Sequence, residues 1–180
     1  MPKLTLYHND MSSCAQKVRF TLAVKGLDWK SVEMDLRRGD QLDPKFLKIN
    51  PKGLVPALVH DEKILLESNI IVDYLNDAFP EPALLPAGPV ARAQARTWMK
   101  KLDDGLHLET IALSFAIAFR HQLIAACENE AGLEKHFLSI PDPYVQQVQR
   151  EIVPDGIQSP RFTQAICAFD KLLSDLDDEL

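Results

Sequence analysis

SSCAQKVRFTLAVKG, residues 12–26, is the stretch around which the rest of the chain can be placed, because it predicts a short helix with a polar tip. Ser12 and Ser13 are favourable N-cap residues, and Gly26 is the residue type that most often ends a helix. Apolar residues near helical spacing predict a buried stripe: Ala15, Val18, Phe20 and Leu22. The stretch therefore predicts a helix that begins at a pair of hydroxyl groups.

The residues before this helix, KLTLYHND at 3–10, form an apolar, β-prone run that ends in turn residues. The predicted order is strand, loop and helix N-terminus. The first N–H groups of a helix lack partners within it, and the helix dipole favours an anion there, so we expect a ligand site at the loop mouth. An ordinary capped helix explains the same residues, since capping serines are common. The choice between a ligand site and a plain cap therefore depends on other segments of the chain.

The composition is that of a globular protein with a substantial core: of 180 residues, 46% are hydrophobic and 26% are charged. The net charge of −6 and the lack of a basic stripe argue against a nucleic-acid partner. The N-terminus has no apolar targeting core, and the apolar stretch at 111–119 is too short to cross a bilayer. We therefore expect a cytoplasmic protein with no membrane partner.

Cysteine and histidine usage predicts reduced thiols and no metal cofactor. Cys14, Cys127 and Cys167 are an odd number at wide spacing, which does not suit a disulfide framework. The five histidines include no pair at the helical spacing of a zinc site.

The segments after the first helix predict the rest of a small sheet. WKSVEM at 29–34 alternates like a strand, and the polar loop behind it has room for a short helix around Pro44–Lys48. The runs NPKGLVPALVH at 50–60 and KILLE predict two strands joined by a hairpin, and Glu67 and Ser68 then open another helix. The predicted order is βαβ followed by ββα.

The second half is predicted to be helical. PEPALLPAGP at 80–89 is a proline-rich connector and marks the predicted domain boundary. A long helix follows over 91–127, with Gly105 as the point at which it can bend. Residues 137–158 contain three prolines and predict an irregular excursion with at most a short helix, and a final helix begins after 159–160. Acidic residues at its end oppose the helix dipole, so we expect a shortened chain.

With these segments in place, the chain resembles the cytosolic glutathione transferases over nearly its whole length. SSCAQKVR looks like the zeta-class motif, NPKGLVPALV like the family's strand led by a cis-proline, and LLESNIIVDYL like its Glu-Ser turn. The resemblance implies an α/β thioredoxin-like domain over 1–79 that binds glutathione. It also implies an all-α domain over 87–180, C-terminally shortened, that contributes the second-substrate site, and a homodimer.

The resemblance assigns the reacting group to the helix tip. It implies that Ser12, with Ser13 as second choice, donates a hydrogen bond to the glutathione thiolate. Cys14 is the rival, because a cysteine at a helix N-terminus can itself form a mixed disulfide with glutathione. Thiol-transferring relatives carry their cysteine at the position of Ser12, which favours a packing role for Cys14.

The resemblance also places the arms of glutathione, a tripeptide with two carboxylates and one ammonium group. The backbone of Val55, ahead of Pro56, is implied to pair with the cysteinyl residue as an added strand would. Ser68 is expected to cap its helix and hold the γ-glutamyl carboxylate, while Glu67 holds the ammonium group. The loops at Gln41 and Lys52 are implied to bind the glycyl end.

A serine donor is sufficient for the chemistry. The thiol has an ordinary pKa near about 8.5, so a few per cent is thiolate at pH 7. Lowering this pKa by about two units requires about 2.7 kcal/mol. One charge-assisted hydrogen bond contributes roughly 1.5 to 3 kcal/mol and a helix N-terminus roughly 0.3 to 1, so no buried base is needed.

The expected function is a detoxifying glutathione transferase that attacks a hydrophobic electrophile bound near residues 102–118, with the 137–158 segment as a wall. Two alternatives use the same thiolate: isomerisation of a maleylacetoacetate-like diketo acid, suggested by the SSC motif, and cleavage of β-aryl ethers, suggested by the likeness of 137–158 to bacterial etherases. A third alternative is a non-catalytic interaction module on the same fold. In that module the hydroxyl of Ser12 is dispensable.

Overall fold

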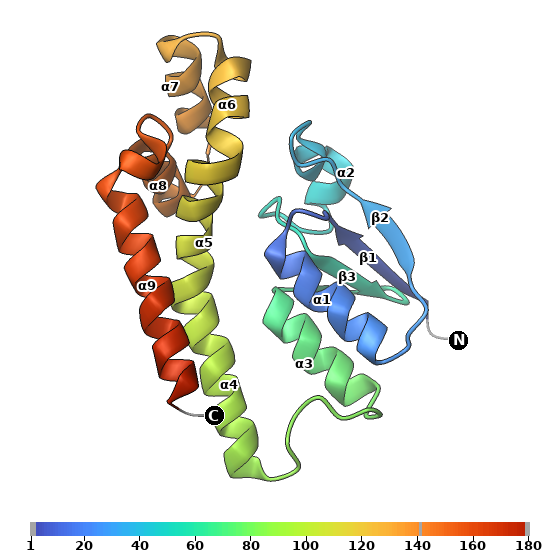
Figure 1. The fold of residues 1–180 in the computed structure, drawn as a ribbon. Coiled ribbons are helices and arrows are strands. Elements are labelled where there is room, and N and C mark those ends of the chain that lie inside the picture. The colour runs from blue at the N-terminus through green and yellow to red at the C-terminus, as the bar shows by residue number, and fades with distance from the viewer. Residues whose placement is uncertain (1–2, 141, 179–180) are drawn as a thin grey trace. The chain divides into compact units, whose positions relative to one another are not determined.

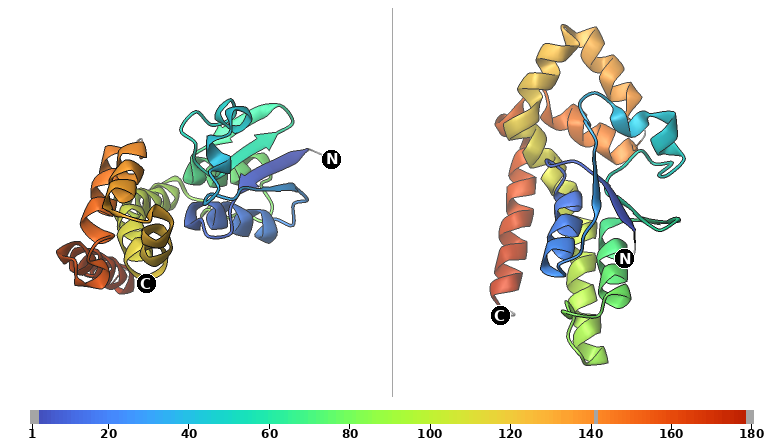
Figure 2. Two further views of the ribbon diagram at one scale, coloured as in Figure 1. Left: turned by 90° about the horizontal axis from the view of Figure 1, so that it is seen from above. Right: turned by 90° about the vertical axis from the view of Figure 1, so that its right-hand side faces the viewer.

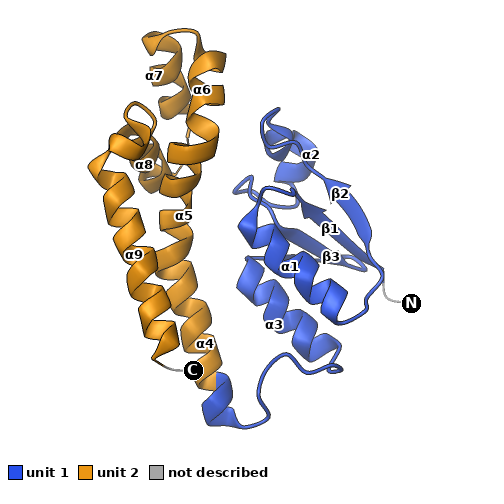
Figure 3. Ribbon diagram, in the orientation of Figure 1, with its two compact units in different colours: residues 1–92 blue, residues 93–180 orange. Residues whose placement is uncertain are grey.

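The computed structural model describes residues 3–140 and 142–178. The chain divides into two compact units, Met1–Arg92 and Ala93–Leu180 (Figure 3). The first unit includes the proline-rich connector that we predicted as the boundary, together with the first residues of the helix after it. Pro141 of the predicted excursion lies outside the described residues.

A four-stranded mixed sheet forms the centre of the first unit (Figure 1). Its strands, in the order β2-β1-β3-β4, are β1 (Leu4–His8), β2 (Lys30–Glu33), β3 (Ala57–His60) and β4 (Lys63–Leu66). β1 pairs parallel with β2 and antiparallel with β3, and β3 pairs antiparallel with β4. The predicted order of βαβ followed by ββα is confirmed, and the sheet is thioredoxin-like.

Helices pack on both faces of this sheet. On one face, α1 (Ser13–Val24) and α3 (Ser68–Ala78) share a core with the strands in which each residue is at most 2% exposed: Leu4, Leu6, Val18, Leu22, Leu58, Ile71 and Leu75. On the other, the short predicted helix α2 (Pro44–Leu47) inserts Phe46, whose ring centroid lies 5.5 Å from that of Tyr7. Successive strand residues alternate between faces, so β1 contributes to both cores.

The ends of α1 follow the prediction, but one residue of its predicted stripe does not. Ser12 is the N-cap, and its Oγ accepts a hydrogen bond from the N–H of Ala15 at 3.2 Å. Gly26 has a φ of +59°, the left-handed conformation that closes many helices. The prediction that Phe20 is buried is wrong, since it is 70% exposed. It lies two residues after Val18, about 200° around the helix, and so faces away from the buried stripe.

The second unit is helical, as predicted, and begins with a continuous helix over Pro89–Cys127. Its parts are α4 (Pro89–Lys101), a π-helical segment η2 (Leu102–Leu106), α5 (His107–Ser114), a second π-helical segment η3 (Phe115–Phe119) and α6 (Arg120–Cys127). Gly105, the predicted bend point, lies in η2. Among the described residues, this helix alone is long and apolar enough to cross a membrane, a statement of length and composition only.

The structure corrects the prediction for residues 137–158. In place of an irregular excursion they contain the end of α7 (Glu130–Ser139), all of α8 (Pro143–Ile152) and a 3-10 turn, η4 (Gly156–Gln158). Pro143 occupies the first turn of α8, where a missing N–H costs nothing, and Pro154 follows the end of that helix. The prolines therefore mark the boundaries of a helix instead of preventing one.

The last helix, α9 (Pro160–Asp177), begins as predicted, with the Oγ of Ser159 accepting a hydrogen bond from the N–H of Arg161 at 3.2 Å. It lies alongside the long helix of its unit (Figures 1 and 2). Arg161 approaches Glu109 of α5 to 2.6 Å and donates to the hydroxyl of Tyr144 of α8 at 2.8 Å. The Arg161 and Glu109 side chains are only 12% and 16% exposed. The ion pair joins α9 to α5, and the hydrogen bond to Tyr144 joins α9 to α8.

Candidate functional site

The loop between β1 and α1 presents Ser12 at the tip of a helix. Ser12 is half-buried and has extended backbone angles (φ −81°, ψ 112°), as an N-cap residue requires. Its Oγ uses a lone pair to accept the hydrogen bond from Ala15, so the hydroxyl proton is available to a ligand atom in front of the helix. The site combines a hydroxyl donor with the positive end of a helix dipole.

Ser13 and Cys14 are the first two residues of α1. Ser13 is exposed, and Cys14 is half-buried and not part of a disulfide. The three residues considered as the reacting group thus lie within one turn, and Ser12 is the one at the cap position.

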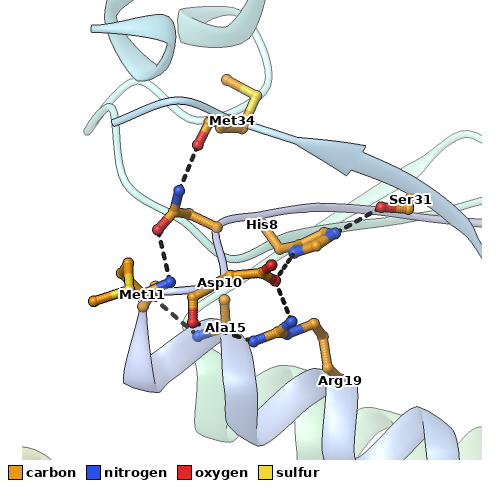
Figure 4. A network of polar contacts seen from close by, with 9 residues as sticks. His8, Asp10, Met11, Ala15, Arg19, Ser31 and Met34 are labelled. Carbon is orange, nitrogen blue, oxygen red and sulfur yellow. Dashed lines mark hydrogen bonds and ion pairs between the residues drawn. The ribbon is translucent and has the colours of Figure 1, made fainter. Parts of the chain in front are cut away.

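Side chains from neighbouring elements hold this loop (Figure 4). Nδ2 of Asn9 donates to the carbonyl oxygen of Met34, just after β2, at 2.8 Å, and Oδ1 of Asn9 accepts from the N–H of Met11 at 2.9 Å. Arg19 of α1 donates to both the carboxylate and the backbone carbonyl of Asp10. The loop is therefore fixed both to the end of β2 and to α1.

His8, the last residue of β1, is buried beneath this loop. Its Nε2 lies 2.7 Å from the Oγ of Ser31, and its ring meets that of Trp29 edge-on, with centroids 5.4 Å apart. Its buried Nδ1 lies 3.9 Å from the carboxylate of Asp10. Burial, and after it the charge of Arg19, lower the pKa of His8 from its ordinary value of 6.5, against the opposing effect of nearby carboxylates.

We expect His8 to make the stability of the first unit depend on pH. As the pH falls through about 6.5, the unfolded chain binds a proton that folded His8 still resists, so stability declines from there down to the lowered pKa. His8→Gln should flatten this decline, measured as the urea midpoint between about pH 7 and about pH 5. His121→Gln, at an exposed site in the second unit, should retain it. An unchanged decline in His8→Gln would assign it to another group.

A second loop leads to Val55, ahead of β3. Asn50 is buried at its base, where Oδ1 accepts from the N–H of Lys52 at 3.1 Å and Nδ2 donates to the carbonyl oxygen of Leu54 at 2.7 Å. The peptide bond between Val55 and Pro56 is cis, as the resemblance implies. One buried side chain therefore shapes the loop that leads to the expected cysteinyl contact.

Gln41 lies beside this second loop, in the 3-10 turn η1 (Asp40–Leu42). The backbone carbonyl oxygen of Gln41 would lie 3.1 Å from a Cβ atom at Gly53, which also has a φ of +62°, so the tight approach and the left-handed backbone both favour glycine there. Nε2 of Gln41 donates to the carbonyl oxygen of Leu36 at 3.3 Å. The structure thus places Gln41 next to the loop of Lys52, with its Nε2 already engaged and its buried Oε1 without a hydrogen-bond partner among the described residues.

Lys52 and Glu67, predicted at opposite ends of the ligand, contact each other. Nζ of Lys52 lies 2.8 Å from Oε1 of Glu67, and both side chains are exposed. This hydrogen bond raises the pKa of Lys52. Because exposed ion pairs contribute little stability, a ligand carboxylate can replace Glu67 as the partner of Lys52.

The prediction that Ser68 caps α3 is wrong in detail. The N-cap is Glu67, whose φ of +65° is uncommon for a non-glycine residue and whose side chain makes no capping hydrogen bond. Ser68 is the first residue of the helix and is 7% exposed. The first turn of α3 still presents backbone N–H groups to which a carboxylate can bind.

Sequence reasoning missed the residues that shape these loops. Asn50 carries a signal, because an asparagine ahead of Pro-Lys-Gly is typical of a turn closed by its side chain. Asp10 and Arg19 carry none, since their contact depends on how the loop folds against α1.

The second-substrate site near residues 102–118 stays a prediction. Those residues run from η2 into η3 in the second unit. Within residues 3–140 and 142–178, no group of three or more side chains is placed to hold a metal ion.

Comparison with known proteins identifies relatives of this chain. Residues 6–83 match the family model of the glutathione S-transferase N-terminal domain. Glutathione S-transferase Z1 of Arabidopsis thaliana is 50% identical over 84 residues, which are 47% of this chain and 38% of Z1. Maleylacetoacetate isomerase of Pseudomonas aeruginosa is 43% identical over 97 residues, which are 52% of this chain and 45% of the isomerase.

Protein LigF of Sphingobium sp. strain SYK-6 is similar over more of the chain: it is 38% identical over 143 residues, which are 77% of this chain and 55% of LigF. The crystal structure described as beta-etherase LigF superposes with a TM-score of 0.82 and 31% identity, covering 98% of this chain and 72% of that one. The chain spans about half the length of the curated relatives it matches, or less. The thioredoxin-like sheet, the helical second unit and these matches agree, and the chain belongs to the glutathione S-transferase family.

Proposed function

We propose that this chain is a glutathione transferase in which the hydroxyl of Ser12 donates a hydrogen bond to the sulfur of glutathione. The bond keeps the sulfur ionised for attack on an electrophilic carbon of a hydrophobic substrate. In that step a sulfur electron pair forms the C–S bond, and the displaced electron pair departs with the leaving group or moves onto an adjacent atom.

The position of Ser12 carries this proposal. The residue caps α1, is half-buried, and holds its hydroxyl proton free of the bond with Ala15. A charge-assisted bond of roughly 1.5 to 3 kcal/mol, added to the effect of the helix tip, lowers the thiol pKa by about two units and makes thiolate the main form at neutral pH. The test is the ultraviolet thiolate band of bound glutathione, which Ser12→Ala should abolish near neutral pH.

The peptide arms of glutathione follow the other two loops. The backbone of Val55 pairs with the cysteinyl residue, and the first turn of α3, at Ser68, binds the γ-glutamyl carboxylate. Lys52 exchanges its partner Glu67 for the glycyl carboxylate, beside Gln41, which leaves Glu67 for the ligand's ammonium group. Lys52 and Glu67 thus pair with each other in the free protein, and each binds the oppositely charged group of glutathione in the complex.

The match with LigF favours aryl ethers as the substrate class. The beta-etherase structure aligns with 98% of this chain, and so includes α7 and α8. In ether cleavage the thiolate attacks the carbon that bears the aryloxy group, so the C–S bond forms as the C–O bond breaks and a phenolate leaves. The isomerase match, which covers 52% of the chain, supports the diketo-acid alternative less strongly.

We expect the chain, supplied with glutathione, to release a phenol from a β-aryl ether faster than it isomerises a maleylacetoacetate-like diketo acid. Product chromatography with both substrates measures the ratio, and reactions without glutathione are the control. Faster isomerisation would overturn the choice of substrate class. If neither substrate nor a simple electrophile reacts and no thiolate band appears, the non-catalytic module is the better account.

We also propose a cytoplasmic homodimer. Within residues 3–140 and 142–178, the cysteines form no disulfide, as suits a reducing compartment. Light scattering of the purified chain should give the mass of two chains. A mass of one chain would contradict the dimer.

A further inference from the structure

We propose that Arg19 is a positioning residue that holds Ser12 in its donating geometry by way of Asp10. The inference rests on the proposed role of Ser12 and adds a residue to that site. Arg19 acts on the loop and does not itself contact glutathione.

Arg19 and Asp10 form a bracket across the start of α1 (Figure 4). Nη1 of Arg19 donates to Oδ1 of Asp10, and Nη2 donates to the backbone carbonyl oxygen of Asp10 at 3.3 Å. Asp10 lies two residues before Ser12, and Arg19 lies in the second turn of the helix that Ser12 caps. The two contacts therefore enclose the segment that carries the hydroxyl, and one of them restrains the main chain directly.

The loop has other tethers, which centre on Asn9, and one of them reaches the main chain of Ser12. Asn9 is held by its contacts with Met34 and Met11, and its carbonyl oxygen accepts from the N–H of Ser12 at 3.2 Å. The ring of His8 is 3.9 Å from the carboxylate of Asp10, which is too far for a hydrogen bond. Within the described part of the chain, it is therefore the Arg19 side chain that donates hydrogen bonds to Asp10.

The restraint of Asp10 by Arg19 affects the hydrogen bond between Ser12 and the glutathione sulfur. A hydrogen bond to sulfur stabilises the thiolate only while the hydroxyl points at it, and a misplacement of about 1 Å can lower a rate about 100-fold. The planar fork of arginine reaches the carboxylate and the carbonyl together, which the single ammonium group of lysine does less well. Without Arg19, we expect the loop to sample positions in which Ser12 no longer faces the sulfur.

The test compares Arg19→Met with Arg92→Met, with glutathione as the probe. Arg92 and Asp77 form a matched pair in the same unit: their side chains are 33% and 62% exposed, against 27% and 61% for Arg19 and Asp10. Each variant loses one partly exposed Arg–Asp pair, so a shared loss of stability is controlled. The measurement is the pKa of the bound thiol, from pH titration of the thiolate absorbance.

We expect Arg19→Met to raise the pKa of the bound thiol by about one unit, which corresponds to a roughly tenfold smaller thiolate population below the pKa. Arg92→Met should titrate like the wild type, and Arg19→Lys should fall between the two. If Arg19→Met titrates like the wild type, or Arg92→Met shifts equally, the positioning role is refuted. Should Arg19→Met fail to fold, Asp10→Asn, which removes the charge from the bracket, decides by the same titration.

Ser12→Ala separates this inference from the proposal on which it rests. If Ser12→Ala abolishes the thiolate band and Arg19→Met leaves it unchanged, the role of Arg19 fails and that of Ser12 stands. If Ser12→Ala leaves the band unchanged, the proposed serine mechanism fails and takes the role of Arg19 with it.

Discussion

Ser12→Ala is expected to lower the rate of glutathione conjugation about 25-fold at pH 7, the ratio of the thiolate fractions for a pKa of about 6.5 and of about 8.5, while the affinity for glutathione falls only about fourfold. The hydroxyl binds the thiolate more strongly than the thiol, so its removal raises the pKa of the bound sulfur towards about 8.5. Most of the affinity is retained because the loops at Val55 and Ser68 still bind the peptide arms.

The deficit has a defined pH dependence. With Ser12 in place, a thiol pKa lowered to about 6.5 makes most of the bound glutathione thiolate at pH 7 and above. In Ser12→Ala the thiolate forms only as the pH approaches about 8.5, so the rate deficit is largest at and below neutral pH and shrinks at about pH 9.

Ser159→Ala is the matched control, because both serines are N-caps that accept a backbone hydrogen bond at 3.2 Å. Each substitution removes a cap worth about 1 kcal/mol. Ser159 belongs to the second unit, is 2% exposed and also donates to the carbonyl oxygen of Glu151 at 2.7 Å, so its loss should destabilise the chain at least as much as the loss of Ser12. Rate–pH profiles and the thiolate titration should single out Ser12→Ala. A Ser12→Ala profile that matches the wild type at every pH would contradict the serine mechanism.

Arg161→Met is expected to destabilise the second unit by about 3 kcal/mol. The substitution leaves the carboxylate of Glu109, whose side chain is 16% exposed, without its cation, and it removes the bond to Tyr144. Breaking a largely buried ion pair on one side costs more than the pair contributes, because the remaining charge stays desolvated.

The measurement is urea unfolding followed by the fluorescence of Trp98 in a Trp29→Phe background, since each unit contains one of the two tryptophans. Arg150→Met is the control, because it removes a half-buried arginine, 36% exposed at its side chain, that pairs with exposed Glu134, and it should shift the midpoint less than Arg161→Met does. Equal shifts in Arg161→Met and Arg150→Met would show that the Glu109 pair is not buried in solution.

The fold of the first unit follows from local patterns in the chain. The alternation of strands, the cap at Ser12 and the stop at Gly26 each depend on neighbouring residues, and each agrees with the structure. The helical content of residues 137–158, where at most a short helix was predicted, was underestimated because prolines were taken as interruptions, although Pro143 at a first turn and Pro154 beyond a last turn are compatible with a helix. Phe20 was wrongly predicted to be buried, because it was included in the apolar stripe although it lies on the opposite side of the helix.

The site was less accessible from sequence than the fold. Motif resemblance predicts which loops carry the candidate site, and it also implies the cis bond before Pro56 that the structure has. The contact of Lys52 with Glu67 and that of Arg19 with Asp10 join residues from separate turns, so no local pattern reveals them. Hydrogen bonds of this kind depend on tertiary structure, which sets their distances and burial.

The most direct test is a crystal structure of the chain with bound glutathione, read for the atom nearest to the sulfur. The serine mechanism predicts the Oγ of Ser12 within hydrogen-bonding distance of the sulfur, with the cysteinyl backbone alongside Val55. A sulfur bonded to Cys14 as a mixed disulfide, or one placed away from the tip of α1, would contradict it.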